Sequence, residues 1–356
     1  MWFLSILGLG RSASGWAGRR RPPGLLPRHR RPMLEQLEDR TLPSSYTAAS
    51  TADLIADINA ANTAGGSNTI VLMANTTFDL TAVNNTTNGA NGLPVIVNRD
   101  TLTISGQGGD IIQRDPAAPD FRLFDVASAG SLTLENLTLQ NGRAVGSGSS
   151  SEGGAIYNRG TLDLNGVTVQ DNLAFGGYAD GNTTAGQDAA GGGVWSSGTL
   201  TLENGTTVQN NQALGGYGGS RTKQAGYPGG NAFGGGVYVA GGTANLTDAT
   251  LYENGVGSGE GGEGTYGYSQ APYGFGEGGG LYVAGGTVSL CNDTVTSNSV
   301  GGYLSGGGEG GGVYIEGKAT VYLDSFTVIN TLNNHDNSGT NGSTANIDGT
   351  YTLRNC

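Results

Sequence analysis

The sequence predicts an all-β protein, namely a single-stranded right-handed parallel β-helix with three strands per coil and a short N-terminal capping α-helix. Composition is the first observation behind this prediction: 67 of the 356 residues are glycine, about 19% where an ordinary protein has about 7%, and only 13% are charged. The other two observations are sequence patterns: a glycine-rich unit that recurs along the chain, and a strand of alternating apolar residues after each copy of that unit. Glycine has no period of three, which excludes collagen, and no apolar run reaches the ~18 residues of a membrane-spanning helix.

The recurring unit consists of three small residues, mostly glycine, followed by an apolar residue and an aromatic residue. Its first copy is Gly153-Gly-Ala-Ile-Tyr157, and the second is Gly191-Gly-Gly-Val-Trp195. The remaining copies start at Gly234, Gly278 and Gly310, so that the spacing between copies runs from 32 to 44 residues. Self-similarity of this kind is typical of solenoid proteins.

Each unit is followed by a short turn, an alternating strand and a third short strand, as in residues 160–165 and 167–169. Segments this short bury their apolar side chains only if like strands stack on like strands in successive coils. The stacking predicts two inward-facing apolar columns. The first contains Ile156, Val194, Val237, Leu281 and Val313, and the second contains Leu164, Leu202, Leu246, Leu290 and Leu323.

Residues 46–66 are predicted to form the capping helix. Thr51 is the expected N-cap, and Leu54, Ile55 and Ile58 lie on one face of the helix. A helix placed directly before the β region would cover the unpaired backbone groups at its open end. We predict the β-helix over residues 67–330, followed over 331–356 by a C-terminal tail that can add a last strand.

The first 45 residues are predicted to be a disordered basic leader for export. Residues 1–40 contain eight arginines and three acidic residues, whereas the rest of the chain contains nine basic and 26 acidic residues. Residues 34–44 (LEQLEDRTLPS) resemble the L-E-x-L-E-D-R segment at the N-terminus of large exported bacterial proteins. This resemblance implies an extracellular or cell-surface location, and the alternative is a short amphipathic helix in a disordered leader. The acidic body disfavours nucleic acid as a partner, because affinity for nucleic acid rests on Lys and Arg.

The first full repeat resembles the repeats of bacterial right-handed parallel β-helix proteins of the pectin-lyase-like type, especially the polymorphic outer-membrane protein repeat. The closest match lies at Ala155, Ile156, Asn158, Leu162, Leu164, Asn165 and Asn172. Residues 53–62 are likewise similar to the cap that opens many such proteins. The resemblance implies the fold, but functions in that family range from adhesion to polysaccharide cleavage, so it does not select one of them.

Asparagine recurs where the third strand of each repeat ends. Asn tolerates left-handed backbone geometry and bonds to nearby backbone groups, so stacked copies can form a ladder along the coils. The predicted structural ladder contains Asn141, Asn172, Asn211, Asn254, Asn298 and Asn330. The alternative is that their side-chain carbonyl oxygens bind a metal ion. We favour the structural interpretation, since tight turns explain asparagine without a ligand, and we predict neither a metal nor another cofactor.

Glycine-rich insertions of variable length follow these asparagines, at residues 142–152, 173–190, 212–233, 255–277 and 299–309. Stacked on one another, they would form a fringe that carries aromatic side chains along one edge. The candidate ligand-contacting aromatics are Tyr178, Tyr217, Tyr227, Tyr266, Tyr268 and Tyr273. Such aromatic faces can bind sugar rings or a partner protein. The alternative is a disordered or self-packing spacer, which the entropic cost of ordering glycine favours.

No catalytic residues are predicted. Glycoside hydrolysis needs two carboxylates that flank the bond, and lyase chemistry needs a strong base. Acidic residues such as Glu260 and Glu277 lie in glycine runs, which position reacting groups poorly. Cys291 and Cys356 are the only cysteines, and the sequence leaves open whether they pair.

The expected function is that of a secreted or cell-surface, non-catalytic β-solenoid acting as a structural, adhesive or carbohydrate-binding module. Its expected partners are polysaccharide or other cell-envelope components, and the sequence leaves open whether chains also associate with one another through the last coil. The alternative is a polysaccharide lyase or glycoside hydrolase of the same fold. Release of sugar ends from acidic polysaccharides would distinguish the alternative from the expected function.

Overall fold

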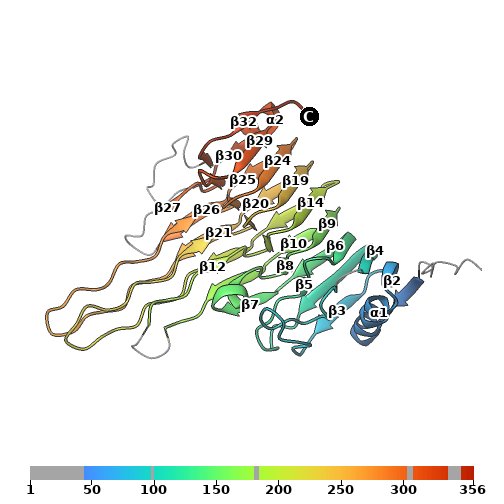
Figure 1. Cartoon of the computed structure of the whole chain (residues 1–356), viewed down its shortest axis with the longest axis horizontal. Helices are drawn as coiled ribbons and strands as arrows, with labels where there is room; N and C mark the ends of the chain where they lie inside the picture. Colours follow the sequence, from blue (N-terminus) through green and yellow to red (C-terminus); the bar gives the residue numbers. More distant parts are fainter. Residues whose placement is uncertain (1–43, 98–99, 180–183, 303–307, 336–345) are drawn as a thin grey trace, which may run out of the picture. The chain divides into compact units, whose positions relative to one another are not determined.

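The protein is a parallel β-helix, as the repeat pattern predicts (Figure 1). The computed structural model describes residues 44–97, 100–179, 184–302, 308–335 and 346–356. The chain divides into two units, Met1–Arg40 and Thr41–Cys356, of which only the second contains described residues. The predicted leader at residues 1–45 therefore lies almost entirely outside the described part of the chain.

Among the described residues, successive coils place equivalent strands side by side in four parallel sheets. The wide sheet contains β1 (Ser44–Ala48), β2 (Gly66–Leu72), β3 (Thr77–Leu80), β4 (Asp100–Arg114), β6 (Ser131–Gln140), β9 (Thr161–Asn165), β10 (Thr168–Gln170), β14 (Thr199–Glu203), β15 (Thr207–Gln209), β19 (Thr243–Thr247), β20 (Thr250–Tyr252), β24 (Thr287–Cys291), β25 (Thr294–Thr296), β29 (Thr320–Leu323), β30 (Thr331–Leu332) and β32 (Thr352–Leu353).

The other three sheets are narrower. The seven-stranded sheet contains β5 (Phe124–Val126), β8 (Ile156–Asn158), β13 (Val194–Ser196), β18 (Val237–Val239), β23 (Leu281–Val283), β28 (Val313–Ile315) and β31 (Ile347–Asp348). The five-stranded sheet contains β7 (Arg143–Gly146), β11 (Leu173–Gly176), β16 (Gln212–Leu214), β21 (Gly255–Ser258) and β26 (Ser299–Gly302). The four-stranded sheet contains β12 (Ala189–Ala190), β17 (Ala232–Phe233), β22 (Gly276–Glu277) and β27 (Gly308–Glu309).

The three predicted strands are present in the four repeats that begin at Gly153, Gly191, Gly234 and Gly278, and two further short strands complete each of these coils. In the repeat that begins at Gly310, the third strand predicted at residues 326–328 is instead part of the helix α2 (Ser325–Asn330). In one coil the predicted strands are β8, β9 and β10, and the additional ones are β11 and β12. Both additional strands lie inside the segment 173–190, which sequence analysis treats as an insertion. They escape detection because Leu173–Gly176 and Ala189–Ala190 contain small residues with little apolar alternation.

Both predicted apolar columns are confirmed as the core of the solenoid. Ile156 pairs with Val194, and Val194 with Val237, in exact parallel register, and all three side chains are fully buried. Leu164 and Leu202 pair in the same way in the wide sheet and are also fully buried. Because one face of each strand is buried, a slip of one residue would expose a whole row of apolar side chains, which specifies the register.

The capping helix α1 (Thr51–Ala64) covers the N-terminal end, where Leu54, Ile58 and Ala61 join the core. Its N-cap is Ser50 and not Thr51, because the Ser50 hydroxyl accepts a hydrogen bond from the backbone N–H of Asp53 at 3.2 Å. The helix ends at Ala64. The following Gly65 has a φ of 62°, a backbone conformation that favours glycine, and its N–H donates to the carbonyl of Ala61 at 2.8 Å. Strand β1 precedes the helix and pairs with β2, so the sheet begins earlier than the predicted residue 67.

The glycine-rich unit satisfies two different steric requirements. Its first glycine, such as Gly191 with φ of 66°, takes a left-handed conformation. Its second glycine is packed against neighbouring backbone: a Cβ on Gly192 would lie 2.3 Å from the carbonyl oxygens of both Gln212 and Gly235. The backbone of adjacent coils thus approaches to a distance that only glycine permits.

Among the described residues, the loops between the five- and four-stranded sheets form a hydrogen-bonded double layer, in which outgoing segments bond to returning segments. The N–H of Gly216 donates to the carbonyl of Gln187 at 2.9 Å, that of Gly230 to Gly216 at 2.8 Å, and that of Gly259 to Gly230 at 2.9 Å. A Cβ on Gly230 would lie 2.0 Å from the Gln187 oxygen. The described loop segments therefore pack on one another through backbone hydrogen bonds, and are not a disordered spacer (Figure 1).

The C-terminal residues complete the last coil. The short helix α2 (Ser325–Asn330) is capped by Asp324, whose carboxylate accepts from the backbone N–H of Thr327 at 2.9 Å. Strands β30, β31 and β32 then pair with β25, β28 and β29. Cys291 and Cys356 form a disulfide with a Cα–Cα distance of 5.9 Å, which ties the chain end to β24. In the described part of the chain, no helix is long and apolar enough to cross a membrane.

Candidate functional site

The asparagine ladder is a structural element of the core. Four of the predicted members, Asn172, Asn211, Asn254 and Asn298, are buried and joined side chain to side chain at 2.9 to 3.0 Å. The Oδ1 atom of Asn254 accepts from both the backbone N–H and the Nδ2 of Asn211. Since an amide oxygen has two lone pairs, both are used, and this oxygen has none left for a metal ion. Among the described residues, no group of three or more His, Cys, Asp or Glu residues is arranged to hold a metal.

Two predicted ladder members lie outside the ladder. Asn141 takes a left-handed φ of 63°, and its backbone carbonyl accepts from the Nε of Arg114, while the next residue, Gly142, donates to the ladder. Asn330 lies at the end of α2 and bonds to the carbonyl of Phe326. The ladder instead continues through Asn334, because the helical turn of α2 shifts the position by four residues. Both asparagines precede the position at which the ladder is bonded, Asn141 by one residue and Asn330 by four.

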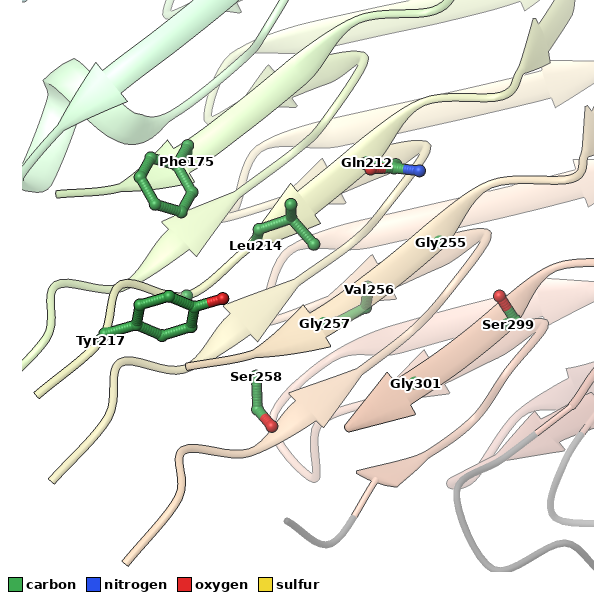
Figure 2. A pocket seen from close by; sticks show the side chains of 11 residues that line it. Phe175, Gln212, Leu214, Tyr217, Gly255, Val256, Gly257, Ser258, Ser299 and Gly301 are labelled. Atoms are coloured by element: carbon green, nitrogen blue, oxygen red, sulfur yellow. The ribbon is translucent and has the colours of Figure 1, made fainter. Parts of the chain in front are cut away.

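A groove of about 610 Å³ lies on the outer face of the five-stranded sheet and is the best candidate for a binding site (Figure 2). One row of register-paired residues across this face runs from Phe175 to Leu214, Gly257 and Gly301. The side chains shrink along this row from an aromatic ring to none, so the sheet surface is hollowed toward the later coils. Tyr217 adds a second aromatic ring at the edge of the groove.

The polar groups of the groove are neutral. Gln212, Ser258 and Ser299 line it, and its described lining includes no Asp, Glu, His, Lys, Arg or Cys. The Ser258 hydroxyl is buried and has no hydrogen-bond partner within the protein. This combination of aromatic rings, bare backbone and hydroxyl or amide groups can hold an uncharged ligand with hydroxyl groups.

The groove gathers only some of the predicted aromatics. Tyr178 and Tyr217 have ring centroids 5.2 Å apart, and Tyr178 also packs edge-on against Phe175 at 4.9 Å. Tyr227 and Tyr266 lie elsewhere on the loops, where Arg221 and Lys223 cover their rings at 4.7 and 5.6 Å. Tyr268 and Tyr273 also lie outside the groove lining. Sequence analysis could not separate the two groups, because loop length alone does not show which tyrosines fold back onto the sheet.

Sequence analysis did not recognise that the aromatic residues of the glycine-rich units form a second group. The aromatic residue of each glycine-rich unit stacks on that of the next coil along the seven-stranded sheet. These residues are Tyr157, Trp195, Tyr238, Tyr282 and Tyr314. The stack could have been predicted from the sequence, because each recurring unit ends in an aromatic residue at the same position. The rings of Tyr157, Trp195 and Tyr282 are at most 9% exposed, so the stack stabilises the sheet and does not present open ring faces.

Carboxylates surround the C-terminal end of this aromatic stack. The Tyr282 hydroxyl donates to Glu316 at 2.9 Å, and burial together with this hydrogen bond raises the pKa of Tyr282. Burial also raises the pKa of Glu277, as do the neighbouring Glu316 and Glu309 carboxylates. With the Tyr282 side chain buried, these groups have no room for a substrate against the ring, and we assign them no chemical role.

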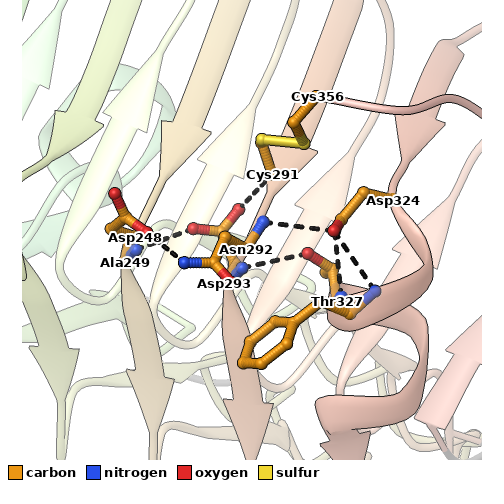
Figure 3. The surroundings of a disulfide bond; sticks show 9 residues. Asp248, Ala249, Cys291, Asn292, Asp293, Asp324, Thr327 and Cys356 are labelled. Carbon is orange, nitrogen blue, oxygen red and sulfur yellow. Dashed lines mark hydrogen bonds between the residues drawn. A yellow bond between two sulfur atoms is a disulfide. The ribbon is translucent and has the colours of Figure 1, made fainter.

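One buried carboxylate lies next to the disulfide (Figure 3). Asp293 is 1% exposed, and its two oxygens accept from the backbone N–H groups of Ala249 and Cys291 at 2.7 and 2.8 Å. Burial raises the pKa of Asp293 to about 7. The two N–H groups oppose this increase, and the Asp324 and Asp248 carboxylates add to it.

This pKa predicts that the protein becomes more stable as the pH falls through about 7. The folded state binds a proton at Asp293 that the unfolded state, with a pKa near 3.8, releases, so stability is gained below the folded pKa and is complete near the unfolded one. Urea unfolding at about pH 8 and about pH 5 should differ by on the order of 2–4 kcal/mol from this group. Asp293→Asn should remove that part of the difference. An unchanged pH dependence in the variant would contradict the assignment.

Comparison of the chain with family models, curated proteins and solved structures gives no match. The function must therefore be inferred from the groove and the surfaces themselves.

Proposed function

We propose that this protein is a secreted or cell-surface β-solenoid that binds a neutral polysaccharide chain in the groove of the five-stranded sheet without cleaving it. The observation that carries the proposal is the lining of the groove: Phe175 and Tyr217 offer aromatic surfaces, Gln212 and Ser299 offer neutral hydrogen-bonding groups, and the described lining contains no Asp, Glu, His, Lys, Arg or Cys. Sugar rings combine apolar faces with hydroxyl groups, which these two kinds of surface complement.

The rest of the molecule supports this role. The Cys291–Cys356 disulfide agrees with an oxidising compartment, as does the export-like leader segment. The hydrogen-bonded loop layer holds the groove wall on an ordered support, so little conformational entropy is lost when a ligand binds. The alternative, a polysaccharide lyase or hydrolase, requires acid and base groups that the groove lining does not contain.

Filling the groove tests the proposal without disturbing the core. A Cβ on Gly301 would lie 3.8 Å from its nearest neighbouring atom, and one on Gly255 would lie 3.5 Å away, so both positions accept a side chain. The double variant Gly255→Val, Gly301→Val should fold and lose binding to neutral polysaccharides in a glycan-array and pull-down assay. Tyr217→Ala should weaken the same binding by roughly tenfold, since an aromatic contact with a sugar is worth about 1 kcal/mol or more.

Tyr266→Ala is the matched control, because this tyrosine is 77% exposed on a loop outside the groove. It should bind as the unmodified chain does. The proposal is wrong if the filled-groove variant binds normally, or if Tyr266→Ala and Tyr217→Ala lose binding equally. Release of reducing or unsaturated sugar ends by the unmodified chain would establish the enzymatic alternative instead.

A further inference from the structure

The outer face of the wide sheet carries an uninterrupted column of hydroxyl groups. The column begins at Ser67, continues through Thr101 and Ser131, and then has threonine in each of the next five coils, ending at Thr320. Every neighbour in this column is paired in direct parallel register. All members except the half-buried Ser131 are exposed, and the residues that follow them in the chain are buried in the core.

A second column runs beside the first, two residues further along each strand. Thr69, Thr103, Thr133, Thr201 and Ser289 supply hydroxyl groups in it. Asp163 contributes the one carboxylate among the paired positions from Thr69 to Tyr322, and Asn245 contributes an amide. We call these two columns the hydroxyl face.

The hydroxyl face is a two-dimensional lattice. Strand spacing sets a repeat of about 4.8 Å from coil to coil, and two residues along a strand set a repeat of about 6.6 Å. Threonine is β-branched, so its χ1 angle is restricted and its hydroxyl and methyl groups keep a similar position in every coil. The buried neighbours, such as Leu162 and Leu200, hold the backbone beneath it. High β-propensity explains threonine on a sheet, but valine, isoleucine and tyrosine have the same propensity, so it does not explain why a hydroxyl group recurs at every paired position of the first column.

A ligand that uses all these groups must itself repeat in two directions and must both donate and accept hydrogen bonds, because each hydroxyl does both. Ordered water at the surface of an ice crystal has these properties. A crystalline polysaccharide also repeats, but its sugar faces are bound through aromatic rings, and among the paired positions of the hydroxyl face only Tyr322 is aromatic. Charge is confined to one side of the hydroxyl face: Asp163 lies in the second column, and Glu135 and Glu203 lie two residues further along their strands. The first column contains no charged residue, and this matters because a charged group orders water around itself and not in a lattice.

We propose that the hydroxyl face binds the surface of ice. This activity uses a different face from the groove on the five-stranded sheet and does not depend on the polysaccharide binding proposed above. The full chain should produce thermal hysteresis, shape growing ice crystals and inhibit ice recrystallisation.

The test introduces lysine into the lattice. The double variant Thr199→Lys, Thr287→Lys places two long charged side chains in exposed positions of the first column and should abolish thermal hysteresis. The matched control is Thr222→Lys, Ser269→Lys, two exposed hydroxyl positions on the glycine-rich loops. Neither residue belongs to the wide sheet, so the control should retain activity. Thermal melting followed by circular dichroism establishes that each variant is folded.

Thr243→Val gives a second variant that keeps the shape of the side chain and adds no charge, and it should reduce the hysteresis by removing one hydroxyl from the middle of the column. The proposal is overturned if the full chain gives no hysteresis and no ice shaping, or if both lysine variants lose activity equally. Binding to crystalline cellulose or chitin without an effect on ice would show that the lattice recognises a solid polysaccharide instead. Loss of neutral-glycan binding in the filled-groove variant leaves this inference untouched, so the two proposals fail independently.

Discussion

Replacing Asn254 with alanine is expected to lower the free energy of unfolding by about 3–5 kcal/mol, a large effect for one side chain. Asn254 is fully buried in the ladder and serves two neighbours. Its oxygen accepts two bonds from Asn211, and its amide donates to Asn298 and to the carbonyl of Val208. Alanine leaves the donors of Asn211 buried without an acceptor, and this costs more than the loss of an average hydrogen bond.

Equilibrium unfolding in urea measures this effect. Asn245→Ala is the control, because Asn245 belongs to β19 of the same coil but is exposed, and its truncation should change stability by no more than about 0.5 kcal/mol. If the two alanine variants were equally stable, the ladder would be a consequence of the coil geometry and not a source of its stability.

Gly192→Ala is expected to cost about 4 kcal/mol or more, and it should interrupt the stacking between coils. The added methyl group would lie 2.3 Å from two backbone carbonyl oxygens, those of Gln212 and Gly235. Both obstacles are backbone, so no side-chain rotation relieves the contact. The adjacent strands would have to separate, which would weaken the parallel hydrogen bonds on both sides of the position.

Gly241→Ala is the matched control for this prediction. It lies in the turn between β18 and β19, and a Cβ there meets nothing within 4 Å. We expect the control to be neutral or slightly stabilising, because alanine reduces the freedom of the unfolded chain. Thermal unfolding and limited proteolysis of both variants provide the measurement. A Gly192→Ala protein as stable as the control would mean that the coils can separate at little cost.

The repeat pattern was sufficient to predict the coil, its inward-facing columns and most of the asparagine ladder. These features depend on residues that recur at equivalent places, such as Ile156 and Val194 or Asn211 and Asn254, and recurrence is visible in the sequence. The predictions for Asn141 and Asn330 were wrong for a related reason. Each lies close to an equivalent place, but the pairing of the coils assigns the position to Gly142 in one case and to Asn334 in the other.

The groove illustrates what the repeat pattern could not predict. Phe175, Leu214, Gly257 and Gly301 occupy equivalent positions of successive coils but include an aromatic residue, an aliphatic residue and two glycines, so no recurring residue type links them. The choice between Tyr217, which lines the groove, and Tyr266, which does not, depends on where the glycine loops fold back. The path of these loops depends on backbone hydrogen bonds, such as the one between Gly230 and Gly216. Every glycine has the same backbone groups, so the sequence does not show which glycines pair.

By itself the sequence determined the class of fold, the direction in which each strand faces and the positions at which coils stack, because burial of alternating apolar side chains permits only one register. The hydroxyl column was not predicted, although a threonine follows a turn glycine in four successive repeats, at Thr161, Thr199, Thr243 and Thr287. Only the tertiary structure decided the location of the groove, the order within the glycine loops and the pairing of Cys291 with Cys356. These features arise from contacts between segments that have no common pattern, and such contacts become visible only when the chain is folded.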